Sequence, residues 1–154
     1  MACMKVVAVA GNFDPLHDGH IEHIREASGL GDFLVIITHN DYSVAKFTKK
    51  HECYVPLWAR KSMLQGILFV YRIPGIVVVA ETITGVEKPQ NGDCSKALSV
   101  VRPDVFAKGG DRTPSNMPQE ELDVCRSIGC EVVYGVGKKK NSSSEIIGRL
   151  NATY

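Results

Sequence analysis

The 154-residue sequence lacks the features of a nucleic-acid-binding or membrane protein. Lys plus Arg (18) nearly balance Asp plus Glu (17), so no overall field attracts DNA, RNA or an anionic membrane. No apolar run approaches the length of a membrane span, and the run at residues 6–10 is too short for the core of a signal peptide. We therefore expect no nucleic-acid or membrane partner, and an anionic ligand must be held locally.

Cysteine is scarce and irregularly spaced. The five cysteines are odd in number and include no Cys-x-x-Cys pair, which argues against both a disulfide framework and a cysteine metal site. A reducing cytoplasm is the expected location. The 44% hydrophobic content is enough for one core, so residues 1–154 are expected to form a single domain.

Hydrophobic periodicity predicts alternating strands and helices. Short β-branched runs predict strands at residues 5–10, 33–38, 76–80, 105–107 and 131–134. Helical patterns cover residues 19–28, 56 to about 68, 94–101, 118–128 and a last segment starting near 143. Residues 40–55 are expected to be a loop, and residues 135–141 a flexible segment. The alternation predicts an α/β, Rossmann-like, doubly wound and mainly parallel five-stranded sheet with helices on both faces.

Ligands of such sheets bind beyond the carboxyl ends of the strands. That edge would gather the loops at residues 11–20, 39–55, 108–113 and 135–144, all of which contain groups that bind anions. The strongest signal is Gly-Asn-Phe-Asp-Pro-Leu-His-Asp-Gly-His at residues 11–20, directly after the first strand. His17 and His20 would lie on one side of the first helical turn, where free N–H groups already favour phosphate.

Zinc binding is the alternative explanation of these histidines. His17, His20 and His23 could contribute ligands, but no cysteine or further histidine nearby completes a tetrahedral set. We therefore expect no metal held by protein ligands alone, and His23 is interpreted as a surface or supporting residue.

The motif at residues 11–20 resembles the signature of the nucleotidylyltransferase superfamily, Gly-x-Phe-Asp followed by His-x-Gly-His. The likeness runs from Val6 to Leu150 and is greatest to the adenylyltransferase domain that makes ADP-heptose. Glycerol-3-phosphate and ethanolamine-phosphate cytidylyltransferases are somewhat less similar. The resemblance implies transfer of a nucleoside monophosphate from an NTP to a phosphorylated small molecule, with Mg²⁺ bound to the triphosphate and pyrophosphate released. It also implies a homodimer.

The motifs assign roles to individual residues. Lys46, on the loop after the second strand, would join His17 and His20 in catalysis, whereas Lys50 and Lys61 are expected to be exposed to solvent. The residues expected to bind the nucleotide are Asn12, Phe13, Gly19, Lys108, Gly109, Gly110, Asp111, Ser142, Ser143 and Ser144. Those expected to bind the second substrate are Asp14, Arg60 and Arg112.

Several of these roles have structural alternatives. Asp14 would either support its loop or help to place Mg²⁺, and a structural ion pair competes with the substrate role of Arg60. A tight turn alone would explain Gly109 and Gly110, and helix capping would explain a single serine. Arg112 stands where the resembled family usually has an aromatic residue, so it would either stack on a purine or hold the acceptor phosphate.

The expected chemistry is direct in-line displacement at the α-phosphorus, without a covalent enzyme intermediate. ATP and a sugar 1-phosphate are the favoured substrates. CTP with an alcohol phosphate such as glycerol 3-phosphate, or ATP with FMN, are alternatives within the same fold. A nucleotide-binding regulatory module without turnover is the alternative from another class.

Overall fold

The computed structural model describes residues 3–48, 50, 52–137 and 143–153. Its strands form one parallel sheet in the order β3-β2-β1-β4-β5. The strand bounds are β1 Val6–Ala10, β2 Phe33–Thr38, β3 Gly75–Val79, β4 Val105–Ala107 and β5 Glu131–Val133. From β1 the chain winds outward to β3 and then crosses back to β4, so the order reverses between β1 and β4. The predicted doubly wound α/β fold is confirmed.

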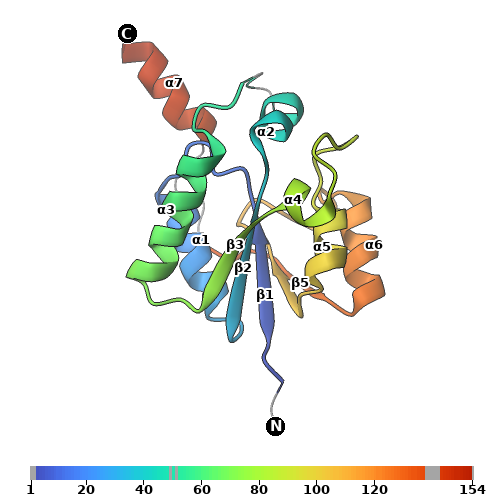
Figure 1. Cartoon of the computed structure of the whole chain (residues 1–154). Helices are drawn as coiled ribbons and strands as arrows, with labels where there is room; N and C mark the ends of the chain where they lie inside the picture. The colour runs from blue at the N-terminus through green and yellow to red at the C-terminus, as the bar shows by residue number, and fades with distance from the viewer. Residues whose placement is uncertain (1–2, 49, 51, 138–142, 154) are drawn as a thin grey trace.

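Helices cover both faces of this sheet (Figure 1). The helices of the described residues are α1 Asp18–Ser28, α2 Asp41–Phe47, α3 Leu57–Val70, α4 Ala80–Thr84, α5 Ser95–Val101, α6 Gln119–Ile128 and α7 Ser143–Thr153. Helices α1 and α3 lie on one face, and α5 and α6 lie on the other. Helix α2 lies beyond the carboxyl end of β2, at the edge where ligands bind in such folds.

Alternating residues of the strands divide the core into two layers. On one face, Val7 and Ile36 pack with Ile24 of α1 and Leu64 of α3. Their neighbours in the strands turn to the other face, where Ala8 packs with residues of α5, α6 and β4 that include Leu98 and Phe106. Both layers are buried because helices cover each side, which explains why the strands read as continuous apolar runs.

The prediction of a loop at residues 40–55 is wrong for its first half, because α2 occupies Asp41–Phe47. Asn40 caps this helix: its side-chain oxygen accepts a hydrogen bond from the N–H of Ser43 at 2.8 Å. Ser43 and Val44 of this helix are buried. With only these two buried residues, the helix carries little periodic signal in the sequence. The short α4 was also not predicted, and it begins directly where β3 ends.

Arg60, on α3, is enclosed by the loops that follow β1 and β2. Its side chain has no exposed surface, so it cannot contact a substrate in this structure. The structural role is therefore the one observed, and the role in substrate binding stays a prediction. Its guanidinium donates hydrogen bonds of 2.7–3.0 Å to the carbonyl oxygens of Asn12, His39 and Val55, the hydroxyl of Thr38 and the carboxylate of Asp41.

Replacement of Arg60 by Met is expected to destabilise the fold by about 3 kcal/mol or more, because it leaves buried carbonyl oxygens without donors. Chemical denaturation monitored by circular dichroism measures this loss. Arg126→Met is the control, since the side chain of Arg126 on α6 is 76% exposed and its loss should change stability by no more than about 0.5 kcal/mol. Equal effects of the two substitutions would contradict the structural role.

Candidate active site

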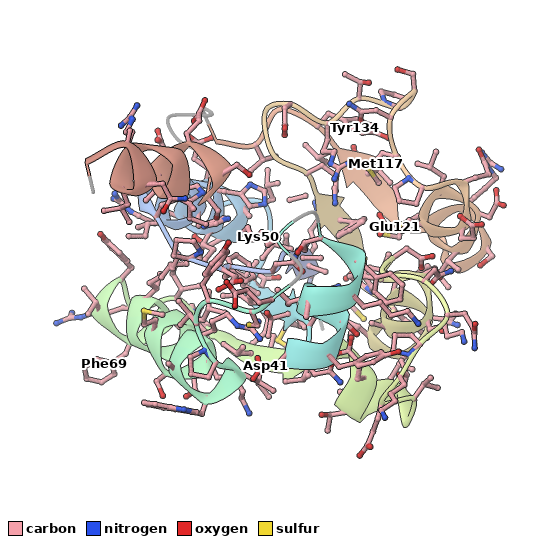
Figure 2. The ribbon with its side chains drawn as sticks, turned by 90° about the horizontal axis from the view of Figure 1, so that it is seen from above. Asp41, Lys50, Phe69, Met117, Glu121 and Tyr134 are labelled. Atoms are coloured by element: carbon pink, nitrogen blue, oxygen red, sulfur yellow. The ribbon has the colours of Figure 1, made fainter. Side chains whose placement is uncertain are left out.

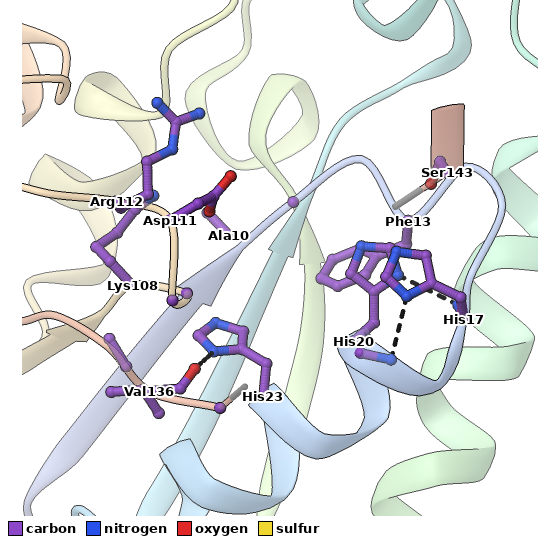
Figure 3. Close-up of a pocket in the computed structure, with 16 residues that line it drawn as sticks. Ala10, Phe13, His17, His20, His23, Lys108, Asp111, Arg112, Val136 and Ser143 are labelled. Atoms are coloured by element: carbon purple, nitrogen blue, oxygen red, sulfur yellow. Dashed lines mark hydrogen bonds between the residues drawn. The ribbon is translucent and has the colours of Figure 1, made fainter. Parts of the chain in front are cut away.

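A pocket of about 320 Å³ opens where β1 and β4 end, at the reversal of strand order (Figure 3). The loops after β1, β4 and β5 line it together with the first turns of α1 and α7. The predicted site residues that it brings together are Phe13, His17, Gly19, His20, Lys108, Gly109, Gly110, Asp111, Arg112 and Ser143. The pocket thus contains most of the residues expected to bind the nucleotide.

The two histidines of the motif form the beginning of α1. His17 is the N-cap, and its Nδ1 accepts a hydrogen bond from the N–H of Gly19 at 3.1 Å. In return, Nδ1 of His20 accepts from the N–H of His17 at 3.3 Å. The rings stack with their centroids 3.7 Å apart. This reciprocal pair is a capping box made by histidines, and it fixes both rings at the helix end that favours phosphate.

These hydrogen bonds determine the tautomers of the two rings. An Nδ1 that accepts a hydrogen bond carries no proton, so each neutral ring holds its proton on Nε2. Burial, together with the neighbouring His17, lowers the pKa of His20 from 6.5 to about 3. Burial also lowers the pKa of His17, against the opposing effect of Asp18. Both rings are therefore neutral N–H donors near pH 7.

Phe13 explains the Gly-x-Phe part of the motif. Its buried ring meets the edge of His20, with centroids 5.0 Å apart. The same ring lies against Gly11, where an added Cβ would approach it to 3.1 Å. A side chain at Gly11 would therefore displace the ring that supports His20.

Asp14 binds the protein itself. Its side chain is buried, and its two carboxylate oxygens accept hydrogen bonds from the N–H groups of Tyr54 and Val55 at 3.1 and 2.7 Å. Both oxygens face backbone N–H groups in this structure, and the role of Asp14 in substrate binding stays a prediction. Its alternative role is observed: Asp14 fastens the end of the loop after β2 to the loop after β1.

The structure separates the two lysines of the loop after β2. Lys46 is exposed on α2 and does not line the pocket; its ammonium donates to the hydroxyl of Tyr42 at 3.0 Å. Its catalytic role stays a prediction. Lys50 was expected to be exposed, but its ammonium donates to the backbone carbonyl of Asp14. Figure 2 shows Lys50 near the middle of the carboxyl edge of the sheet.

The charge of Lys50 also affects the pKa values of the histidines in the pocket. Its positive charge contributes to lowering the pKa of both His17 and His20. Burial lowers the pKa of Lys50 itself, while the neighbouring Asp14 opposes that shift. Since these interactions cross 36 positions of the sequence between Asp14 and Lys50, no local pattern could have found them.

The turn after β4 forms another wall of the pocket. The backbone of Lys108 is fixed against the end of β5 and the loop after it, because its N–H donates to the carbonyl of Val133 and its carbonyl accepts from the N–H of Val136. The positive φ that glycine permits is not used at Gly109 or Gly110; the glycines that use it nearby are Gly135 and Gly137. A Cβ on Gly109 would meet no atom within 4 Å, so this position borders open space that a ligand can fill.

Other predicted residues lie around this wall or outside it. Arg112 is exposed and donates to the carbonyl of Asn116 at 3.1 Å. The hydroxyl of Ser143, at the start of α7, donates to the carbonyl of Pro15 at 3.0 Å and so joins α7 to the loop after β1. Ser144 and Asn12 do not line the pocket, and Ser142 lies outside the described residues.

Metal ligands are few at this site. No group of three or more His, Cys, Asp or Glu side chains in the described part of the chain could hold a metal ion. Asp111 is the carboxylate that lines the pocket. One carboxylate fits Mg²⁺ that binds mainly to phosphate oxygens and water.

Among the described residues, no helix is both long and apolar enough to cross a membrane.

His23, which the sequence analysis interpreted as a surface or supporting residue, is a pocket residue that was not among the predicted site residues. It follows His20 by one helical turn and lines the same pocket (Figure 3). The signal was present in the sequence: His17, His20 and His23 recur every three residues, and this spacing places them along one side of a helix.

Comparisons with known proteins agree with this geometry. The chain is 31% identical over 133 residues to bifunctional protein HldE of Haemophilus ducreyi, covering 86% of this chain and 23% of that protein. It is 32% identical over 117 residues to HldE of Streptomyces coelicolor, covering 76% and 22%. The chain thus spans about a quarter of the length of these curated relatives.

Solved structures show the same fold. A lipopolysaccharide core biosynthesis protein from Thermoplasma volcanium superposes with a TM-score of 0.59 at 25% identity, covering 88% of this chain and 98% of that chain. TmcAL of Thermotoga maritima, solved with alpha-thio ATP, gives a TM-score of 0.65 at 10% identity, covering 97% and 51%. At this low identity the second likeness concerns the fold alone.

The fold and the histidine pair at the start of α1 define a nucleotidyltransferase-type domain. The profile of the cytidylyltransferase-like family matches residues 8–149. The chain belongs to the cytidylyltransferase-like family.

The tautomers of the histidines can be tested by ¹⁵N–¹H NMR. We expect Nε2–H signals from His17 and His20, and no titration of His20 between pH 8 and 5 because its pKa is about 3. Below pH 6.5 the unfolded chain takes up a proton that folded His20 does not, so stability should fall as the pH drops toward 3. His20→Gln should reduce this dependence. A His20 midpoint near 6.5 would contradict the neutral pair.

The two lysines can be compared by single-turnover kinetics of Lys50→Ala and Lys46→Ala. We expect Lys50→Ala to lower the single-turnover rate of nucleotidyl transfer by about tenfold or more, because the ammonium of Lys50 lies beside the loop that carries the histidines. Lys46→Ala should have the smaller effect. The reverse order would show that Lys46 moves to the phosphates when substrate binds.

Proposed function

We propose that this domain transfers AMP from ATP to a sugar 1-phosphate and releases pyrophosphate. The observation that carries the proposal is the pair of stacked, neutral histidines whose Nε2–H groups stand at the start of α1, beside the pocket. Such donors match the oxygens around an α-phosphorus under attack. A site that only senses a nucleotide has no need for donors aimed at a developing charge.

The residues of this chain would bind and orient the substrates. The N-terminal amides of α1 and the two imidazole N–H groups would bind the α- and β-phosphates of the NTP. The acceptor phosphate would attack the α-phosphorus in line with the departing pyrophosphate. Preorganised donors stabilise the charge that grows on the phosphoryl oxygens, and positioning supplies much of the remaining rate enhancement.

The choice of substrates rests on similarity and on the wall after β4. The curated relatives are bifunctional HldE proteins, and a structural relative is a lipopolysaccharide core biosynthesis protein, which favours a sugar phosphate. Arg112 lines the pocket and would hold the acceptor phosphate or stack on the base. Mg²⁺ bound to the triphosphate would supply charge neutralisation, with Asp111 as the neighbouring carboxylate. A homodimer in the cytoplasm also stays a proposal, and mass measurement in solution tests the dimer.

The test is pyrophosphate release measured with all four NTPs against a panel of sugar 1-phosphates, alcohol phosphates and FMN. We expect the highest rate with ATP and a sugar 1-phosphate. His17→Asn should lower turnover by about a hundredfold or more, because asparagine keeps the helix cap but lacks the Nε2–H donor. His20→Ala should have a similar effect.

Arg126→Met is the control, and it should keep the wild-type rate because Arg126 lies exposed on α6. A clear preference for CTP with an alcohol phosphate would replace the adenylyl proposal with a cytidylyl one. Near wild-type rates in both histidine variants would contradict the catalytic role of the pair.

A further inference from the structure

His23 differs from the other two pocket histidines in its hydrogen bonding. Its Nδ1 lies 2.6 Å from the backbone carbonyl oxygen of Val136. A carbonyl oxygen can only accept, so Nδ1 carries the proton and a neutral ring has its lone pair on Nε2. His17 and His20 hold their protons on Nε2 instead. His23 is therefore a hydrogen-bond acceptor in a pocket whose other imidazoles are donors.

The ring of His23 presents Nε2 to the cavity. Figure 3 shows Nδ1 turned to Val136 and the opposite edge of the ring turned toward the space between Lys108 and His20. Within the described part of the chain, no hydrogen-bond partner of Nε2 is found. The acceptor is thus available to a ligand.

The loop after β5 holds His23 in this orientation. Gly137 lies directly against it, since an added Cβ would come within 2.9 Å of the Cα of His23. The N–H of Gly137 also donates to the carboxylate of Glu26 at 2.8 Å. The loop after β5 therefore contacts α1 at His23 and at Glu26, one turn later, and the hydrogen bond to Val136 sets the orientation of the His23 ring.

The charge state of His23 suits an acceptor. Burial lowers its pKa from 6.5, the hydrogen bond to Val136 opposes the shift, and the charge of Lys108 adds to the lowering. The ring is accordingly neutral near pH 7, and Nε2 keeps its lone pair. Imidazolium would offer a donor at this point instead.

The position of His23 indicates which part of an NTP it would meet. The phosphates would bind at the first turn of α1, and His23 lies one turn farther along that helix. Around it the pocket is lined by Lys108 and by small or apolar residues such as Ala107, Gly109 and Val136, and a Cβ added to Gly109 would meet no atom within 4 Å. These surroundings fit a base better than a phosphate.

We propose that Nε2 of His23 accepts a hydrogen bond from the exocyclic amine of the bound base. Adenine and cytosine carry such an amine, whereas uracil and hypoxanthine carry a carbonyl oxygen whose lone pairs would face the lone pair of Nε2. His23 therefore selects amine-bearing nucleotides. The inference rests on the proposed function, which requires an NTP in this pocket, and adds a residue that reads the base.

Two substitutions separate the acceptor from the support of the loop. In His23→Asn the amide nitrogen can occupy the place of Nδ1 and keep the bond to Val136, but nothing replaces Nε2. In His23→Gln the amide reaches the place of Nε2 and can present an oxygen there. Binding of ATP, purine riboside triphosphate and 2′-deoxy-ATP to each protein is measured by calorimetry with Mg²⁺, without an acceptor. Purine riboside lacks only the amine of adenosine.

The wild-type protein should bind ATP about tenfold more tightly than purine riboside triphosphate, the range of one hydrogen bond to a buried group. His23→Asn should weaken the binding of ATP by about that factor and leave the affinity for purine riboside triphosphate unchanged. The unchanged affinity would also show that the variant is folded. His23→Gln should restore part of the preference.

If His23→Asn kept the wild-type preference for ATP over purine riboside triphosphate, the inference about His23 would be overturned and the proposed function would not be affected. So would a loss that disappears with 2′-deoxy-ATP, because the contact would then be to the ribose. If the wild-type protein bound no NTP, the proposed function would fail together with this inference.

Discussion

The backbone at Val55 is held from two sides, and the geometry of the site depends on it. Its N–H donates to the buried carboxylate of Asp14, and its carbonyl accepts from the buried guanidinium of Arg60. Arg60 also binds the carbonyl of Asn12, so two opposite charges connect the loops after β1 and β2 through their backbones. Neither charge is available to a ligand. Both keep residues 11–17 in the shape that delivers His17 to the start of α1, since buried charges are tolerated only when they are well paired.

The three pocket histidines show that backbone partners, more than residue type, decide what an imidazole can do. They recur every three residues on one helix and are all shifted toward neutrality. Two of them accept backbone N–H groups at Nδ1 and so become donors at Nε2. The third gives its Nδ1 proton to a carbonyl of a distant loop and so becomes an acceptor. One helix face can therefore bind phosphate oxygens at its first turn and a donor group of the nucleoside one turn later.

The fold was largely predictable because buried parallel strands leave a strong local record. The apolar runs at residues 6–9 and 33–38 can be read without knowing their partners, and the motif at residues 11–20 located the start of α1 and its histidine pair. Helix α2 depends on one capping residue and two buried side chains, so its seven residues carry little periodic signal. The structural contacts of Arg60, Asp14 and Lys50 could not be read from the sequence for another reason. Their partners lie far away in sequence, and a charged residue type does not reveal whether its charge faces a ligand or the protein.

The neutrality of His17 and His20 has a consequence for the end of a catalytic cycle. Hydrogen bonds from a charged donor to phosphate are roughly twice as strong as those from a neutral donor. An imidazolium pair would hold inorganic pyrophosphate firmly after the reaction and would make its departure slow. The capping box and burial keep the pair uncharged, so the donors are aimed at the phosphates without the attraction of two full charges. In the proposed reaction, the neutral histidine pair that binds the NTP would also allow pyrophosphate to dissociate, so that the enzyme can bind the next substrate.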